Sequence, residues 1–407
     1  MNEDNQQSVE QVIERVNESA DDSRTKDFKT VVLYPFPAEL DGVSLQGDFL
    51  FRGLKENGYQ VTACDRTAGF EKEVVYKTFE PDVAIGVGFW GDTPSIIKEP
   101  MENNITPVPW LNADGWVANY HDILNELPLM LVTSNWVKET YRRDGVKNQN
   151  ICPVPIGIDT QQMSPIPKDD RRVIKMREIL GIEPDEKFIL TIGGDTTSKG
   201  FQEMLKALSQ VNSDFKDWQY VGKTWEYGQP EYHYNAEQKI IEEYNLPEDR
   251  ITYLDGPLSR ETMRILISSC DIYAAPSRIE GFGMIQVEAG SCGIPVISID
   301  AMGIKDTIVN GKTGFLAKVA ETINLEEEWA YRSMGFEEDH KIQFEEPKTF
   351  AYRADVDELA KYLSMLLTDD ELREKIGSNA REHVKANFDY HKVSKDIAEL
   401  IESKLKL

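Results

Sequence analysis

The sequence predicts an α/β protein made of two halves, each with a parallel sheet covered by helices. Short apolar runs typical of buried strands alternate with amphipathic helical stretches in both halves, as in repeated βαβ units. The length of 407 residues exceeds the size at which one hydrophobic core keeps growing, which favours two domains. Four prolines between Cys152 and Lys168 mark the boundary between the halves.

The first half is expected to form a domain over residues 29–160, after a flexible acidic tail at 1–28. Predicted strands cover 30–34, 60–63, 83–87, 108–111 and 130–133. A turn-rich segment, Asp41–Gly47, precedes a helix that carries Phe49, Leu50 and Leu54 on one face.

The predicted strands of this half end in small or polar residues. Ligands bind beyond the carboxyl ends of strands in open α/β sheets, so Asn112 and Asp114 are candidate site residues. The alternative is plain turn chemistry, because Asn-x-Asp-Gly is itself a strong turn signal.

The second half is expected to form a domain over residues 161–388, which begins with a strand at 188–192 and a glycine-rich loop from Gly193 to Gly200. The loop has neither the spacing of dinucleotide-binding folds nor the Gly-Lys-Ser/Thr of a P-loop. Gly193, Gly194 and Lys199 remain candidates for binding a diphosphate, with Lys199 supplying one positive charge. The alternative is a solvated loop lysine.

The stretch Ala275–Val296 reads strand, glycine turn, helix, strand, and places Glu280 and Glu288 on either side of the turn. The backbone N–H groups of Gly281–Met284 suit phosphate oxygens, because the first amides of a helix have no internal partner. The two carboxylates suit sugar hydroxyls, which donate charge-assisted hydrogen bonds. The alternative makes Glu280 an acid favoured by the helix dipole and Glu288 a solvated helix residue.

The C-terminal part departs from the βα rhythm in an acidic stretch at 319–349, which predicts an insertion or a solvated loop. Three amphipathic helices follow, at 356–367, 371–387 and 391–405. The last segment, 389–407, is long enough to return to the first domain.

Composition narrows the class of partners. The formal net charge of −26 disfavours nucleic acid and anionic bilayers. No secretory signal and no run of about 18 apolar residues is visible, so we expect a soluble, cytoplasmic protein without stable membrane insertion. The four cysteines lack metal-ligand spacing and no Asp-x-Asp follows a strand, so no metal or cofactor is expected. The oligomeric state is left open.

The pattern Pro276–Gly283 followed by Glu288–Val296 resembles the Glu-x7-Glu signature of the group 1 retaining glycosyltransferases. Val154–Asp159, Ser198–Gly200 and Asn310–Gly314 are similar to further family motifs. The resemblance covers roughly residues 30–400. It implies the GT-B architecture, with two Rossmann-like domains that face a central cleft. It also implies a nucleoside-diphosphate-sugar donor, a hydroxyl acceptor and no required metal.

The resemblance assigns roles to individual residues. Glu288 matches the acid that holds the nucleotide ribose, Glu280 the acid near the donor sugar, and Lys199 the phosphate-binding lysine. The segment from Gly42 to Gly47 matches a glycine loop between donor and acceptor. The turn residues that would bind the donor through their backbone are Gly281, Phe282, Gly283 and Met284.

The sequence departs from the family pattern at two of the candidate positions. Gly194 stands where the family usually has an arginine, with Arg278, Arg260 and Lys305 as alternative cations. The segment 112–114 stands where the family often has a histidine near the sugar.

The sequence thus predicts a retaining hexosyltransferase in which Glu280, Lys199, Asn112 and Asp114 serve catalysis. No pair of acids demands a double displacement, and the resemblance implies front-face attack. Two other functions fit the same residues: a nucleotide-sugar epimerase of this fold, and a non-catalytic nucleotide-sugar-binding subunit.

Overall fold

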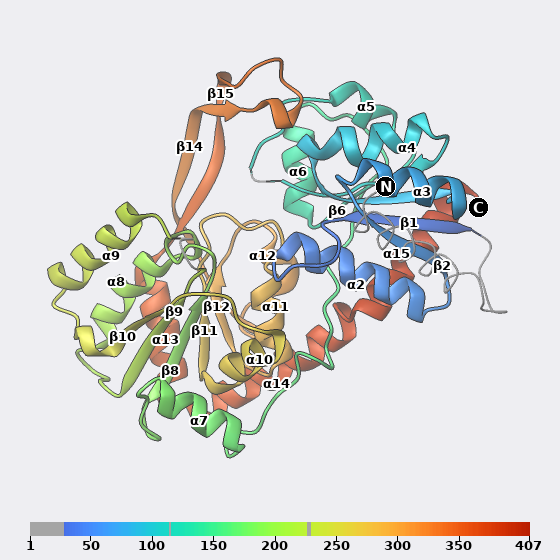
Figure 1. Ribbon diagram of the computed structural model, residues 1–407. Coiled ribbons are helices and arrows are strands. Elements are labelled where there is room, and N and C mark those ends of the chain that lie inside the picture. Colours follow the sequence, from blue (N-terminus) through green and yellow to red (C-terminus); the bar gives the residue numbers. More distant parts are fainter. Residues whose placement is uncertain (1–27, 114, 226–228) are drawn as a thin grey trace, which may run out of the picture. The chain divides into compact units, whose positions relative to one another are not determined.

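The computed structural model describes residues 28–113, 115–225 and 229–407, which form two compact units (Figure 1). The predicted tail at 1–28 therefore lies outside the described residues except for Phe28. Unit 1 comprises the described residues up to 158 together with 326–348 and 388–407, and unit 2 comprises the described residues of 159–325 and 349–387. Each unit contains a parallel sheet with helices, so the predicted fold class, α/β with two Rossmann-like domains, is confirmed.

The sheet of unit 1 has the strand order β2-β1-β3-β5-β6-β7, and β4 pairs with β3. Every pairing is parallel, which requires a crossover connection between successive strands. The strands are β1 (Lys29–Tyr34), β2 (Gln60–Asp65), β3 (Val83–Phe89), β4 (Thr106–Pro107), β5 (Trp110–Asn112), β6 (Met130–Val132) and β7 (Ile151–Pro153).

The helices of unit 1 begin with α2 (Gly42–Glu56), and here the expectation of a glycine loop is wrong. Asp41 caps the helix, because its side chain accepts hydrogen bonds from the amides of Val43 and Ser44 at 2.9 and 3.0 Å. The segment from Gly42 to Gly47 is therefore helical. The other helices of the unit are α3 (Gly69–Thr78), α4 (Glu99–Glu102), α5 (His121–Glu126), α6 (Asn135–Arg143) and α15 (Tyr390–Leu405).

Gly47 lets helix α2 approach strand β1 closely. A Cβ atom added at Gly47 would lie 2.2 Å from Cγ of Tyr34, whereas one added at Gly42 would meet nothing within 4 Å. Close packing, and not loop flexibility, explains the glycine at position 47.

Helix α15 packs on α2 and completes unit 1. Asn57 follows α2 and donates from its side-chain amide to the carbonyl of His391 at 2.7 Å and to Oγ of Ser394 at 3.0 Å. The rings of Phe49 and Tyr390 lie 5.9 Å apart. These contacts place the C-terminal helix in the first unit although it is last in the chain.

The sheet of unit 2 has the order β10-β9-β8-β11-β12-β13, again with parallel pairings. Its strands are β8 (Lys187–Ile192), β9 (Trp218–Lys223), β10 (Ile251–Leu254), β11 (Ile272–Ala274), β12 (Val296–Ile299) and β13 (Gly314–Ala317). Its helices are α7 (Arg171–Ile179), α8 (Phe201–Val211), α9 (Glu231–Glu243), α10 (Arg260–Ser269), α11 (Met284–Ser291), α12 (Ile304–Thr307), α13 (Val356–Thr368) and α14 (Asp370–Asn387).

The acidic stretch forms two paired strands, β14 (Val319–Ala330) and β15 (His340–Ala354), so a solvated loop was the wrong expectation. Ile342 and Phe344 alternate with exposed residues and pack against the apolar cluster of unit 1, where Phe344 meets Trp116 at 5.9 Å. The alternation of period two is the signal that the high charge obscured.

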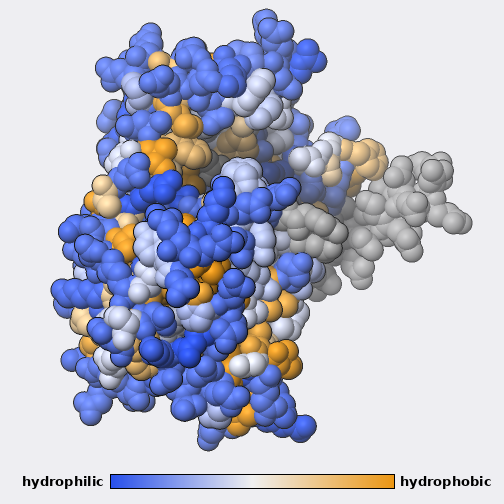
Figure 2. All heavy atoms as spheres, turned by 90° about the vertical axis from the view of Figure 1, so that its left-hand side faces the viewer, coloured by the Kyte–Doolittle hydropathy of each residue, from blue (hydrophilic) through white to orange (hydrophobic). Residues whose placement is uncertain are grey.

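Hydrophilic residues dominate the face in Figure 2, where apolar residues form smaller groups, in keeping with the high charge of the sequence. In the described part of the chain, no helix combines the length and apolar character that crossing a membrane requires. Cys64, Cys270 and Cys292 are buried free thiols, and Cys152 is half-buried.

Candidate donor-binding site

Two loops of unit 2 meet at the carboxyl edge of its sheet. The β8–α8 loop, Gly193–Gly200, follows β8, and the β11–α11 turn, Ala275–Gly283, follows β11. Strands β8 and β11 are parallel neighbours, so their carboxyl ends lie side by side. This adjacency brings together residues that are far apart in the sequence.

Lys199 and Glu280 join the two loops. Nζ of Lys199 lies 2.6 Å from Oε2 of Glu280, and the two side chains are 23% and 17% exposed. The other carboxylate oxygen of Glu280 accepts a hydrogen bond from the amide of Gly283 at 3.1 Å. One of the amides predicted to face phosphate is thus bound by Glu280 in this structure, and Glu280 does act as an acid at a helix N-terminus.

The β8–α8 loop has the features of an anion-binding loop. The amides of Gly194 and Asp195 donate to no acceptor among the residues that the structure describes. The side chain of Lys199 crosses over Gly193, where an added Cβ atom would lie 2.4 Å from Cγ of the lysine. Free amides beside a cation are the usual components of a phosphate site.

Glu288 is buried and paired with Arg260. Its side chain is 0% exposed, and Oε1 lies 2.5 Å from Nη2 of Arg260. The alternative of a solvated helix residue is therefore wrong. Oε2 of Glu288 is buried with no hydrogen-bond partner in the described part of the chain. An unsatisfied buried acceptor costs about 1–3 kcal/mol, which a hydroxyl donor would recover.

The space beside Gly194 is filled by an indole, because a Cβ atom added there would lie 3.3 Å from Cε3 of Trp225. Of the three cations considered as substitutes for an arginine here, Arg278 is bound by Glu203 at 2.8 Å. Lys305 is exposed and lies 3.5 Å from Asp300. Arg260 alone of the three contacts a carboxylate of the Glu-x7-Glu motif.

A buried lysine that the sequence analysis did not place in the site lies at the same edge. Lys223 ends β9, and its carbonyl accepts a hydrogen bond from the amide of Gly193 at 3.0 Å. Its side chain is buried and donates to the carbonyl of Thr224 at 2.5 Å. Burial lowers the pKa of Lys223, although Asp255 opposes that shift.

Three of the candidate site residues, Asn112, Asp114 and Gly42, belong to the first part of the chain and not to unit 2. Asn112 ends β5, and its Oδ1 accepts a hydrogen bond from the hydroxyl of Thr133 at 2.7 Å, at the end of the neighbouring strand β6. Asp114 lies outside the described residues. Gly42 is the first residue of α2.

Two residues of α9 also reach the β8–α8 loop, a contact that no motif in the sequence predicts. His233 lies 2.8 Å from Asp195, and Glu237 accepts hydrogen bonds from Thr196 and Thr197.

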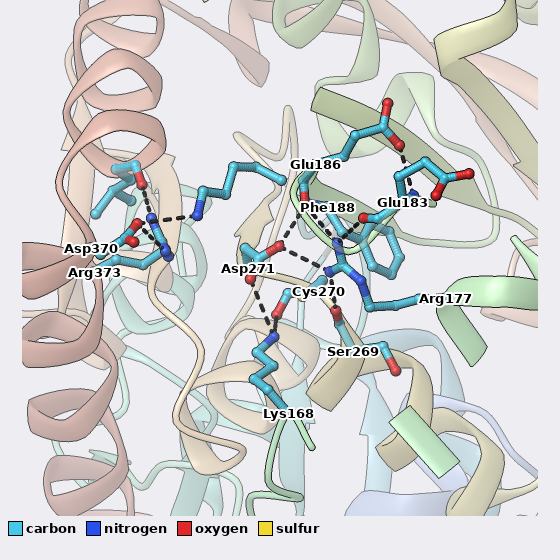
Figure 3. Close-up of polar contacts among 12 residues, drawn as sticks. Lys168, Arg177, Glu183, Glu186, Phe188, Ser269, Cys270, Asp271, Asp370 and Arg373 are labelled. Atoms are coloured by element: carbon cyan, nitrogen blue, oxygen red, sulfur yellow. Dashed lines mark hydrogen bonds and ion pairs between the residues drawn. The ribbon is translucent and has the colours of Figure 1, made fainter. Parts of the chain in front are cut away.

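A cavity of about 560 Å³ lies at the opposite edge of the unit 2 sheet, where β8 begins at Lys187. Figure 3 shows Arg177 and Lys168 on either side of Asp271, with nitrogen-to-oxygen distances of 3.1 and 3.4 Å. Arg177 also donates to the carbonyl of Glu186 at 2.6 Å. These charges satisfy one another, so we interpret the cluster as a clamp on the turn between α7 and β8. It is remote from the strand ends where ligands bind in such sheets.

No group of three or more His, Cys, Asp or Glu side chains is placed to hold a metal ion within the ranges that the structure describes. The site is thus built from a lysine, backbone amides, two carboxylates and an arginine.

The two Rossmann-like units define a GT-B protein. Comparison with known proteins finds a family match for one segment of the chain. Residues 173–331 match the family described as glycosyl transferases group 1, and this segment belongs to it. The predicted resemblance to the group 1 glycosyltransferases is thereby confirmed for this segment. The segment contains the β8–α8 loop, helix α9 and the β11–α11 turn.

Curated relatives match over part of their length. An uncharacterised glycosyltransferase, MJ1178, of Methanocaldococcus jannaschii is 28% identical over 163 residues, which cover 37% of this chain and 42% of the relative. A D-inositol 3-phosphate glycosyltransferase of Xylanimonas cellulosilytica is 25% identical over 189 residues, 46% of this chain and 44% of the relative. The chain thus spans less than half the length of these relatives.

Solved structures resemble the whole fold. Sucrose-phosphate synthase from Thermosynechococcus elongatus aligns with a TM-score of 0.69 and 17% identity, over 93% of this chain and 99% of that one. Anabaena Alr3699/HepE, solved in complex with UDP and glucose, aligns with a TM-score of 0.67 and 16% identity, over 93% and 100% of the chains. At these identities the likeness concerns the fold.

Proposed function

We propose that the protein is a glycosyltransferase that moves a hexosyl unit from a nucleoside-diphosphate sugar to a hydroxyl acceptor with retention of configuration. The observation that carries the proposal is the 2.6 Å contact between Lys199 and Glu280. It supports the proposal because a cation suited to phosphate and a carboxylate suited to sugar hydroxyls lie side by side at the edge of one sheet. A uridine nucleotide is the first donor to test, because Alr3699/HepE was solved with UDP-glucose.

In this proposal the β8–α8 loop binds the diphosphate. Lys199 and the amides of Gly194 and Asp195 stabilise the negative charge that develops as the diphosphate leaves. Fixed donors of this kind contribute about 2.7–4 kcal/mol each in comparable sites. Phosphate would displace Glu280 from Lys199, which frees the carboxylate to accept hydrogen bonds from sugar hydroxyls.

Glu288 would hold the ribose through the oxygen that lacks a partner. Because that oxygen is buried, a hydroxyl reaches it only if a neighbouring side chain moves, whereas Arg260 is paired with the other oxygen, Oε1. Arg260 would then keep the carboxylate charged and oriented while the ribose binds.

Retention is proposed to follow front-face attack, in which the leaving phosphate takes the acceptor proton. A double displacement is not proposed, because no carboxylate is assigned as a nucleophile. The charge-stabilising groups named above belong to the protein, so we propose a reaction that needs no metal ion. Asn112 and Asp114 are kept as proposed residues on the sugar side.

The proposal is tested by titrating the purified chain with UDP, GDP and ADP in a calorimeter, and then by assaying the sugar derivatives of the nucleotide that binds. Binding of one nucleotide and sugar transfer to an added hydroxyl compound, with the donor's anomeric configuration retained in the product by NMR, are expected. Conversion of the sugar nucleotide to an epimer without acceptor would contradict transfer. Binding without any turnover would instead identify a non-catalytic subunit.

A further inference from the structure

We propose that His233 and Glu237, one turn apart on α9, are positioning residues that hold the β8–α8 loop so that Lys199 is presented to the donor phosphate. The proposal rests on the function proposed above. It assigns a role in donor binding to a helix that contributes no residue of the Glu-x7-Glu motif. Residues four apart lie on one face of a helix, so both side chains can reach the same loop.

Glu237 makes the larger set of contacts. Its side chain is 0% exposed, and Oε1 accepts a hydrogen bond from the hydroxyl of Thr197 at 2.7 Å. The single hydroxyl proton of Thr196 is shared between Oε1 of Glu237 at 3.0 Å and Oε1 of Gln229 at 2.6 Å. Oε2 accepts from the side-chain amide of Gln229 at 2.8 Å and the hydroxyl of Tyr253 at 2.9 Å. Both carboxylate oxygens of Glu237 are thus hydrogen-bonded.

All four of these donors are neutral, and no basic side chain contacts Glu237 in the described part of the chain. Burial raises the pKa of Glu237, although the four hydrogen bonds oppose this shift. A buried carboxylate without a cation is costly, and such groups persist where they fix a particular arrangement. The arrangement fixed here is the conformation of the β8–α8 loop.

His233 makes the second attachment. Its Nδ1 lies 2.8 Å from Oδ2 of Asp195, and Oδ1 of the same aspartate accepts a hydrogen bond from the amide of Thr197 at 3.0 Å. Asp195 and Thr197 therefore belong to one network that is bound to α9 at two points.

The network ends next to Lys199. Residues 197–199 form a single 3₁₀ turn, and the amide of Lys199 donates to the carbonyl of Thr196 at 2.9 Å. The hydroxyl of that threonine is one of the groups that Glu237 holds. Loss of the α9 contacts would therefore release the turn that carries Lys199, without removing any group that touches the donor.

A double-mutant cycle tests the proposal with UDP as the probe. Glu237→Ala in the otherwise unchanged chain is expected to weaken UDP binding and to raise the donor KM about 10-fold, with a smaller effect on kcat. In the Lys199→Ala background, Glu237→Ala should weaken UDP binding little further, because the ammonium group that Glu237 helps to position is already absent. Residues that act through one another give non-additive effects, whereas independent ones add.

Conservative variants separate positioning from folding. Thr197→Ser keeps the hydroxyl and should bind UDP as the unchanged chain does, whereas Thr197→Val should resemble Glu237→Ala. His233→Asn keeps a nitrogen near Asp195 and should bind UDP more tightly than His233→Ala. Glu242→Ala, which removes an exposed acid of the same helix, is the matched control and should change nothing.

Each outcome has one meaning. If Glu237→Ala and Lys199→Ala weaken UDP binding additively, or if Thr197→Val binds normally, the positioning role is overturned while the proposed function stands. If the unchanged chain binds none of UDP, GDP and ADP, the proposed function fails and this inference fails with it. If Glu237→Ala does not fold, the two Thr197 variants decide the question.

Discussion

The ammonium group of Lys199 and the carboxylate of Glu280, 81 positions apart in the chain, lie 2.6 Å from each other at the carboxyl edge of the unit 2 sheet. The pair neutralises two charges that a donor would otherwise meet separately. In the proposed function, the donor diphosphate would replace Glu280 as the anion bound by Lys199.

Removing the cation of this pair should impair turnover more than stability. Lys199→Ala is expected to lower kcat/KM by about 100- to 1000-fold, the loss seen when one charge-stabilising donor is removed. Lys199→Arg should retain part of the activity, and Lys216→Ala, at an exposed position of the same unit, should retain all of it. Steady-state kinetics with the donor that calorimetry identifies measures the difference. Full activity of Lys199→Ala would remove this residue from the site.

Breaking the Arg260–Glu288 pair should destabilise unit 2. Arg260→Ala leaves the carboxylate of Glu288 buried without a cation, and such losses cost about 3–5 kcal/mol. Replacing both residues with methionine should cost less, because no charge is left uncompensated. Urea denaturation followed by tryptophan fluorescence compares the variants. A double variant less stable than the single one would contradict the argument.

The clamp of Figure 3 should give unit 2 a defined pH dependence. Burial opposes ionisation of Asp271, but Lys168, the amide of Phe188 and Arg177 together outweigh it and hold the pKa of Asp271 below its usual 3.8. A pKa lowered by folding means that the stabilisation is complete above about pH 4 and is lost as the pH falls through the folded-state value.

Asp271→Asn should accordingly lose about 1–3 kcal/mol at pH 7, the cost of hydrogen bonds to a charged group. The difference from the unchanged chain should shrink as the pH falls below about 4 and through the lowered folded-state pKa, where Asp271 becomes neutral like the asparagine. Urea midpoints measured from pH 3 to pH 8 test this, with the exposed Asp249→Asn as control. A difference that is constant across the range would exclude the electrostatic explanation.

The two glycines at the start of α2 should respond oppositely to the same change. Gly47→Ala forces a methyl group against Tyr34 and should cost about 1–3 kcal/mol, as overpacking does. Gly42→Ala meets no neighbour and should be neutral or stabilising by up to about 1 kcal/mol, because alanine restricts the unfolded chain. Thermal unfolding followed by circular dichroism distinguishes them. Equal midpoints would mean that α2 moves away from β1 at little cost.

Metal removal should leave transfer unchanged. The groups proposed to stabilise the leaving diphosphate are Lys199 and backbone amides, so EDTA in the assay should not alter kcat or the donor KM. Loss of activity that Mg²⁺ or Mn²⁺ restores would show that a cation shares this role.

The sequence predicted the regular elements well where the hydrophobic period was strong. The strand at 30–34 appears as Lys29–Tyr34, and the three final helices appear within one residue of their expected ends. It failed where charge or glycine dominated the local composition. Gly42 was assigned to a loop although Asp41 caps a helix there, and the acidic stretch hid the alternation of Ile342 and Phe344.

What the sequence by itself determined is the chemistry of each motif, because a glycine turn, a lysine after a strand and an acid in a helix act through local backbone geometry. What only the tertiary structure decided is which of these groups meet. Strand order places β8 beside β11, and so Lys199 beside Glu280. Packing of α9 brings Glu237 into contact with Thr197 of the same loop. Helix α10 brings Arg260 into contact with the buried Glu288. These contacts join residues 28 to 81 positions apart, a range over which local sequence carries no distance information.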